Sequence, residues 1–138
     1  MNTVRHNWPA IATATLVYFL LGGVWFTVLQ KPWLAGVGRT VEQIMAAGVS
    51  PAITYGSAVL TTLLLAIFLS WLVQATSSQT AVGGIKVAAW TWLGVVFTTW
   101  STEYAFEARS LDILAINTGY CLTGMLLMGG ILGAWKKK

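Results

Sequence analysis

The sequence is short of charged residues, and this shortage limits the class of protein. Only 9% of its 138 residues are Asp, Glu, Lys or Arg, whereas an ordinary soluble domain carries about 25%. Four acidic and eight basic side chains are too few to cover the surface of a soluble globule of this size. The composition therefore predicts an integral membrane protein whose principal surroundings are the lipid bilayer, with no nucleic-acid partner.

Cysteine and histidine each occur once, as Cys121 and His6. A single cysteine cannot form a disulfide within the chain, which excludes the quinone-linked disulfide enzymes that need cysteine pairs. One histidine and one cysteine also cannot supply the three or four protein ligands of a zinc site. We therefore expect no metal site and no cofactor.

Long apolar runs are what the sequence has instead. A membrane helix needs roughly 20 consecutive apolar residues, and four segments reach this length, at about 8–29, 51–74, 82–105 and 111–135. Every backbone polar group must be satisfied inside lipid, so each segment should be helical. We predict an all-α membrane protein, an antiparallel bundle of four transmembrane helices that forms a single transmembrane domain over residues 1–138.

Residues at the ends of these segments favour the same boundaries. Asn7 and Ser50 each stand close before a proline that a first helical turn tolerates, and Ser110 can cap the fourth helix. Between the first two segments, Thr40 followed by Gln43 resembles a capping box. This pattern predicts a short interfacial helix between the first two membrane helices, on the membrane surface or over the mouth of the bundle.

The distribution of basic residues predicts the orientation. An even number of spans puts both termini on one side, and lysine and arginine are enriched on the cytoplasmic side. The side of the termini carries more of them (Arg5, Lys86, Lys136, Lys137 and Lys138) than the opposite side (Lys31, Arg39 and Arg109). We therefore expect both termini in the cytoplasm.

Small residues inside membrane helices favour close packing. The candidates for helix packing are Gly22 and Gly23 in the first helix and Gly119, Gly129 and Gly133 in the fourth. They could pack helices together within the bundle or form the face of a homo-oligomer. The sequence leaves both alternatives open.

The groups needed for chemistry inside the membrane are missing. Intramembrane serine hydrolysis requires a base, but His6 is terminal and no Lys or Asp lies at mid-depth beside a serine. Small multidrug transporters are also four-helix proteins of this size, but they depend on a carboxylate in the first helix, which is absent here. We expect no enzymatic activity and no catalytic residues.

Most acidic residues gather around the turn between the third and fourth helices. With Ser110 at the apex, Glu103 and Asn117 lie at equal depth, roughly 10 Å below it at about 1.5 Å per residue. Two interpretations follow: a hairpin locked by hydrogen bonds between helices, or an outward-facing polar pocket. The pocket would have Glu103, Asn117, Tyr120, Trp92 and Thr99 at its base and Glu107, Arg109, Trp33 and Trp25 at its rim.

Two stretches resemble a known bacterial family. Residues 106–135, "FEARSLDILAINTGYCLTGMLLMGGILGAW", and the N-terminal "NWPAI…LLGGVWFTVLQKPWLAGVG" resemble the domain of unknown function seventeen sixty-one, over nearly the whole chain. Where that family often continues into a Tyr-Ser-Pro sequence, this chain reads "FTVL". The positions that match the family pattern are Phe106, Glu107, Arg109, Asn117, Gly119, Tyr120, Trp25 and Trp33.

The resemblance implies a small four-span protein of the bacterial inner membrane and implies no activity. Two functions remain open. One is a non-enzymatic component that acts through helix–helix association with itself or with a larger membrane partner. The other is a carrier or channel for a small solute, which would use the outward-facing pocket.

Overall fold

The computed structural model describes residues 5–136, and within them four helices are long and apolar enough to cross a membrane. They are α1 (Trp8–Val28), α4 (Pro51–Ala75), the continuous helix Ala81–Phe106 and α7 (Leu111–Ala134). The third comprises α5 (Ala81–Thr91), a π-helical turn η1 (Trp92–Phe97) and α6 (Thr98–Phe106). The predicted all-α bundle of four membrane helices is confirmed.

The helix starts follow the local sequence signals in three of four places. Asn7 accepts a hydrogen bond from the Ala10 N–H at 3.3 Å, and Ser110 accepts one from Ile113 at 3.4 Å. Thr40 and Gln43 form the expected capping box. Ser50 makes no capping hydrogen bond, so the start of α4 is set by Pro51, whose ring fixes a helical φ angle.

The connection between α1 and α4 holds two short helices where the sequence predicted one. The expected helix is α3 (Val41–Ala46), and the additional one is α2 (Gln30–Val37). Pro32 stands in the first turn of α2, where no helical hydrogen bond is lost, and Gly38 ends it with a left-handed φ of 70°. Gly36 packs against Ile113, which places α2 against the start of α7.

The start of α1 and the end of α7 lie at the same end of the bundle. The Asn7 side chain donates a hydrogen bond to the Trp135 carbonyl at 3.0 Å. This contact agrees with an even number of spans. Of the basic tail, Lys136 is exposed, whereas Lys137 and Lys138 lie outside the described residues.

Helices α5 and α7 approach so closely that their backbones touch. A Cβ atom on Gly84 would overlap the Gly129 carbonyl, and one on Gly133 would overlap the Thr80 carbonyl. Gly129 and Gly133 thus pack helices together within the bundle, which is one of the two alternatives that the sequence left open for the glycines. Close backbone approach of this kind is the main source of helix affinity in lipid.

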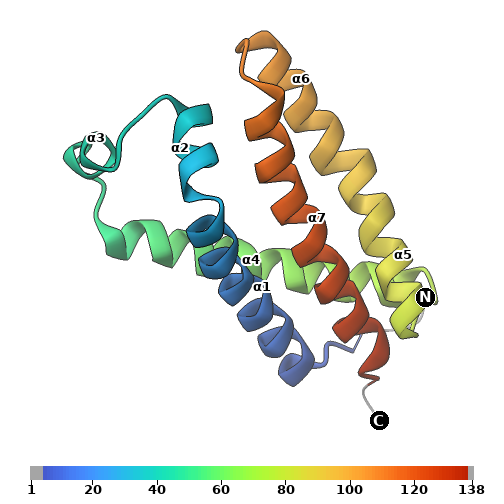
Figure 1. Cartoon of the computed structure of the whole chain (residues 1–138). Coiled ribbons are helices and arrows are strands. Elements are labelled where there is room, and N and C mark those ends of the chain that lie inside the picture. Colours follow the sequence, from blue (N-terminus) through green and yellow to red (C-terminus); the bar gives the residue numbers. More distant parts are fainter. Residues whose placement is uncertain (1–4, 137–138) are drawn as a thin grey trace.

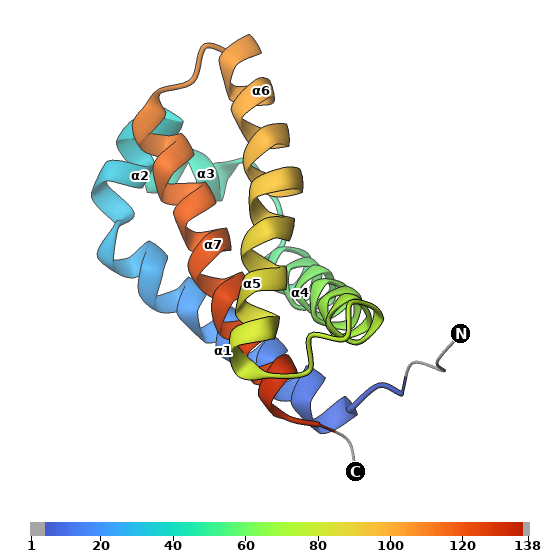
Figure 2. The ribbon, with the colours of Figure 1, turned by 90° about the vertical axis from the view of Figure 1, so that its right-hand side faces the viewer.

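Helix α4 does not run parallel to its neighbours. Figures 1 and 2 show it crossing α1, α5 and α7 obliquely, with its first half leading away from them towards α3. Its second half packs into the core, which contains Ala10, Ile11, Ala14, Ala66, Leu69, Met125 and Met128. Residues 51–57 of α4 are all exposed, so the interface between α1 and α4 is closed at one end only.

Candidate functional site

Three tryptophans from three elements donate hydrogen bonds to one short stretch of α7. Trp25 of α1 donates to the Ile116 carbonyl at 3.1 Å, and Trp92 of η1 donates to the Thr118 carbonyl at 2.8 Å. Trp33 of α2 donates to Oδ1 of Asn117 between them, at 3.2 Å. Indole N–H groups buried in an apolar setting need such partners. Residues 116–118 therefore hold α1, α2 and η1 at one level of α7.

Asn117 is bound on both sides of its amide. Its oxygen accepts from Trp33, and its nitrogen donates to the Tyr104 hydroxyl at 2.8 Å. Tyr104 is buried, whereas Glu103 is exposed. The expected hydrogen bond between Glu103 and Asn117 is thus replaced by one from Asn117 to the residue next in sequence.

The π-helical turn explains this one-residue difference. In a regular α-helix about 11 residues complete three turns, which would put Glu103 on the face of Trp92. A π-helical turn uses i→i+5 hydrogen bonds and accommodates an extra residue. The face that starts at Trp92 therefore reaches Tyr104, and Thr99 is turned outward to an exposed position.

The charged residues of the α6–α7 turn stay at the surface. Arg109 forms an ion pair with Glu107, and both side chains are exposed. The Arg109 guanidinium also lies over the Tyr104 ring, 5.0 Å from its centre, in a cation–π contact. All four acidic residues of the chain, Glu42, Glu103, Glu107 and Asp112, are exposed, so no carboxylate is available inside the bundle for proton-coupled chemistry.

Trp90 and Trp92 lie two residues apart in the third membrane helix, but they have different surroundings. Trp92 packs against the core and bonds to α7. Trp90 is 73% exposed and lines a hollow between the end of α4 and α5, together with Leu72 and Lys86. Only Trp92 belongs to the helix–helix contacts.

Aromatic side chains pack against three glycines on α1 and α7. A Cβ on Gly124 would overlap the Tyr18 ring, and one on Gly22 would lie 2.8 Å from the Tyr120 hydroxyl. At Gly119 a Cβ would make ordinary contact with Trp25, at 3.4 Å. Gly23 differs from these glycines, because nothing lies within 4 Å of its Cβ position. Space is therefore left beside Gly23 on the surface of α1.

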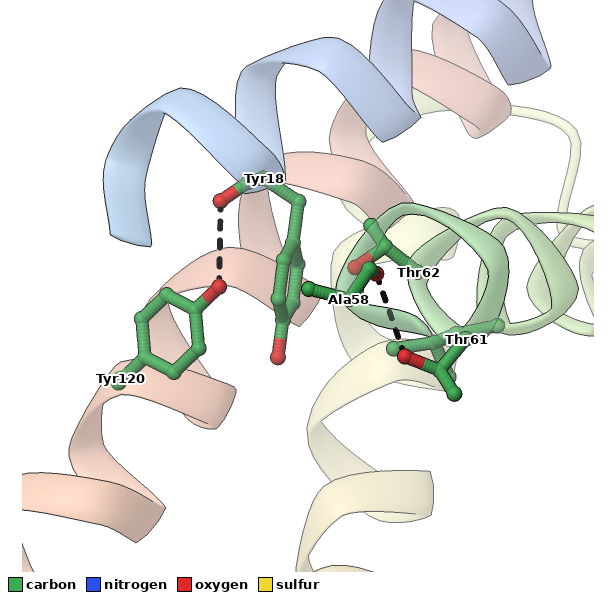
Figure 3. A pocket seen from close by; sticks show the side chains of 6 residues that line it. Tyr18, Ala58, Thr61, Thr62 and Tyr120 are labelled. Atoms are coloured by element: carbon green, nitrogen blue, oxygen red, sulfur yellow. Dashed lines mark hydrogen bonds between the residues drawn. The ribbon is translucent and has the colours of Figure 1, made fainter. Parts of the chain in front are cut away.

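That space belongs to two adjoining hollows between α1 and α4. The larger has a volume of about 590 Å³ and the smaller about 290 Å³, and Ala58 and Tyr120 line both. We call them together the α1–α4 groove. Figure 3 shows the Tyr18 side chain between Tyr120 and α4, with its hydroxyl directed away from α1. The Tyr120 hydroxyl donates to the Tyr18 carbonyl at 3.3 Å.

The lining of the groove is aromatic and uncharged. Its rings are Tyr18, Phe19, Phe26, Tyr55 and Tyr120, and its polar groups are hydroxyls and one amide, from Thr27, Thr54, Thr61, Thr62 and Gln30. Of the nine residues predicted for the polar pocket and its rim, only Tyr120 lines this groove. Asn117, Trp92, Trp33 and Trp25 form the hydrogen-bonded cluster described above, and Glu103, Thr99, Glu107 and Arg109 are exposed.

Sequence reasoning missed the groove because its signal is weak. Tyr18 and Thr62 are ordinary members of apolar spans, and only the oblique course of α4 brings them to one opening. A tyrosine four residues before the Gly22-Gly23 pair was the available sign, since glycines mark places where a ring from a neighbouring helix can pack.

Comparison with curated proteins finds no match, and comparison with solved structures finds none either. A family model does match, over residues 9–133, and it covers all four membrane helices almost completely. Its description is a protein of unknown function, DUF1761. The matched segment includes the tryptophan cluster, the glycine contacts and the groove. The chain belongs to the DUF1761 family.

Proposed function

We propose that the protein acts without enzymatic chemistry, through helix–helix association in the membrane, and that it associates with a second copy of itself. The observation that carries this proposal is the course of α4. Residues 51–57 are exposed, and the first half of α4 leads away from the other membrane helices. The first half of α4 touches α1 on its groove side, as Tyr55 does with Phe19, and its outer side is open. A membrane helix with such an open side is a natural point of contact between chains.

The outer face of α4 carries a small residue at the right place. At 3.6 residues per turn, Ile53, Gly56 and Leu60 lie on the side opposite Ala58, which faces the groove. Nothing lies within 4 Å of the Cβ position of Gly56. Helices in lipid associate where a small residue lets backbones approach. The glycines of α5 and α7 are already used inside the bundle, so Gly56 is the position we expect at an interface between copies.

The alternative of a solute carrier with a pocket between α6 and α7 has less support. Asn117, its proposed base, is bound to Trp33 and Tyr104, and Glu103 is exposed outside that contact. We further propose that both termini face the cytoplasm of a bacterial inner membrane, because basic residues are more frequent on their side.

Cysteine cross-linking in proteoliposomes of the purified protein tests the association. The native Cys121 is first replaced by alanine, and single cysteines are then introduced by Gly56→Cys and Leu60→Cys. Ala58→Cys is the matched control, because it lies on the same helix two residues away but faces the groove. Under an oxidant we expect disulfide-linked dimers from Gly56→Cys and Leu60→Cys and few from Ala58→Cys. Equal dimer yields at the three positions, or none at Gly56 and Leu60, would contradict self-association through this face.

A further inference from the structure

The α1–α4 groove has the features of a ligand site. It lies on the opposite side of α4 from the face proposed for self-association. It opens between two helices that are closed at their other end by Ala10, Ile11, Ala14, Ala66 and Leu69. The larger hollow of about 590 Å³ falls within the range of about 300–1,000 Å³ that is usual for small-molecule sites. Because its walls are membrane helices, a ligand can enter sideways from the lipid.

The Thr62 side chain, which lines the smaller hollow, makes no hydrogen bond within the described residues. Thr62 is only 7% exposed, and its hydroxyl has no hydrogen-bond partner within residues 5–136. The neighbouring Thr61 differs, because its hydroxyl donates to the carbonyls of Ser57 and Ala58 at 2.9 and 3.2 Å. The Thr62 hydroxyl is therefore free to donate a hydrogen bond to a ligand oxygen in the smaller hollow.

The aromatic rings that line the groove indicate what kind of ligand would fit. Rings from α1, α4 and α7 already pair edge to face along the groove: Phe19 with Tyr55 at 6.5 Å, Tyr18 with Tyr120 at 4.9 Å, and Phe26 with Tyr120 at 5.2 Å between ring centres. Such an arrangement favours another flat ring, because edges and faces of aromatic rings attract each other. A saturated chain would gain only non-directional contacts.

Charge decides against ionic ligands. No Asp, Glu, Lys, Arg or His lines either hollow, and a charged group buried there would lose its hydration without compensation. We propose that the α1–α4 groove binds an uncharged, membrane-soluble molecule that carries a flat unsaturated ring and a carbonyl oxygen, with the oxygen accepting a hydrogen bond from Thr62. Quinone-type rings with a short alkyl tail belong to this class.

Binding of decyl-benzoquinone to the delipidated full-length protein, followed by native mass spectrometry in mild detergent, tests the proposal. We expect one equivalent to bind. Thr62→Val keeps the shape of the side chain and removes its hydroxyl, and it should weaken binding about fivefold, which is the usual effect of one lost hydrogen bond. Thr98→Val is the matched control and should leave binding unchanged, because Thr98 lies on α6 outside the groove and its hydroxyl is bonded to the Gly94 carbonyl.

Two further arms separate this ligand class from others. Ala58→Phe places a ring where both hollows meet and should abolish binding. Decanol has a similar tail but no ring and should bind at least tenfold more weakly. The proposal is overturned if decanol binds as well as the quinone, if Thr98→Val and Thr62→Val have equal effects, or if Ala58→Phe binds normally. Dimer formation is measured separately on the Gly56 face, so the failure of either proposal leaves the other testable.

Discussion

The two interfaces that hold this bundle together, α5 with α7 and α1 with α4, show what closes a contact between membrane helices. Both join apolar membrane helices of 21–26 residues, since α5 is the first part of the continuous helix Ala81–Phe106. In the first, Gly84 and Gly129 bring the two backbones into contact. In the second, the helices touch over one half and then separate around aromatic rings. Apolar side chains occur at both interfaces, and they do not by themselves hold helices together, because the surrounding lipid is equally apolar. The interfaces differ in whether small residues in matching positions let the backbones approach.

The largest expected effect comes from filling the closed interface. Gly84→Leu places a side chain where the Gly129 carbonyl already lies and should destabilise the protein by about 3 kcal/mol or more, since this overpacking meets backbone rather than flexible side chains. Unfolding in mixed micelles of detergent and dodecyl sulfate measures the loss. Gly94→Leu, in the same membrane helix as Gly84, is the control, because its Cβ position is open. Equal stability of the two variants would show that α5 and α7 are not in contact.

A second effect separates hydrogen bonding from packing on α7. Asn117→Leu removes the bonds to Trp33 and Tyr104 and should cost about 1–2 kcal/mol in the same assay, since hydrogen bonds between membrane helices contribute about 0.6 kcal/mol each and at most about 1.7. Tyr104→Phe removes one of the two bonds and should cost about half as much.

Glu103→Gln is the matched control for this pair. It changes the side chain that sequence reasoning would have joined to Asn117, and it should leave stability unchanged because Glu103 is exposed. A loss of stability for Glu103→Gln as large as that for Asn117→Leu would indicate that Glu103 contacts Asn117. It would contradict the pairing of Asn117 with Tyr104 described here.

The sequence predicts the membrane helices well and their mutual contacts poorly, for physical reasons. The spans follow from hydropathy and from capping residues such as Asn7 and Ser110, which act locally. The partner of Asn117 depends on the π-helical turn at Trp92–Phe97, which shifts every later residue by one position and leaves no composition signal. The groove depends on the angle at which α4 crosses α1, and that angle is set by contacts distant in the chain.

A smaller effect tests the turn that joins α6 to α7. Ala108 adopts a left-handed backbone with φ of 52°, a conformation that costs an alanine roughly 1–2 kcal/mol and a glycine almost nothing. Ala108→Gly should therefore stabilise the protein by about 0.5–1 kcal/mol, less than the full strain because glycine gains entropy in the unfolded chain. Thermal melting measures the gain. Ala105→Gly, inside α6, should have the opposite sign, and a loss at both positions would contradict the turn geometry.

The smallest effect concerns α3, outside the membrane helices. Hydrogen bonds from its own backbone N–H and from Thr40 hold the pKa of Glu42 below its ordinary value. The carboxylate therefore stabilises the start of α3 above the unfolded-state pKa, and this contribution is lost as the pH falls through the lower folded-state pKa. The protection of the α3 amides, measured as the exchange rate relative to the intrinsic rate at the same pH, should decrease on acidification in the wild type and change less in Glu42→Gln. Protection that increases at low pH would contradict this assignment.

The central claim, that glycine contacts close one interface while their absence leaves the other open, is tested most directly by one methyl group. Gly129→Ala and Gly23→Ala add the same atom to two membrane helices, one in backbone contact and one with nothing within 4 Å. We predict that the free energy of unfolding falls by about 2 kcal/mol for Gly129→Ala and does not fall for Gly23→Ala. A loss of equal size at both positions, or none at Gly129, would contradict the account.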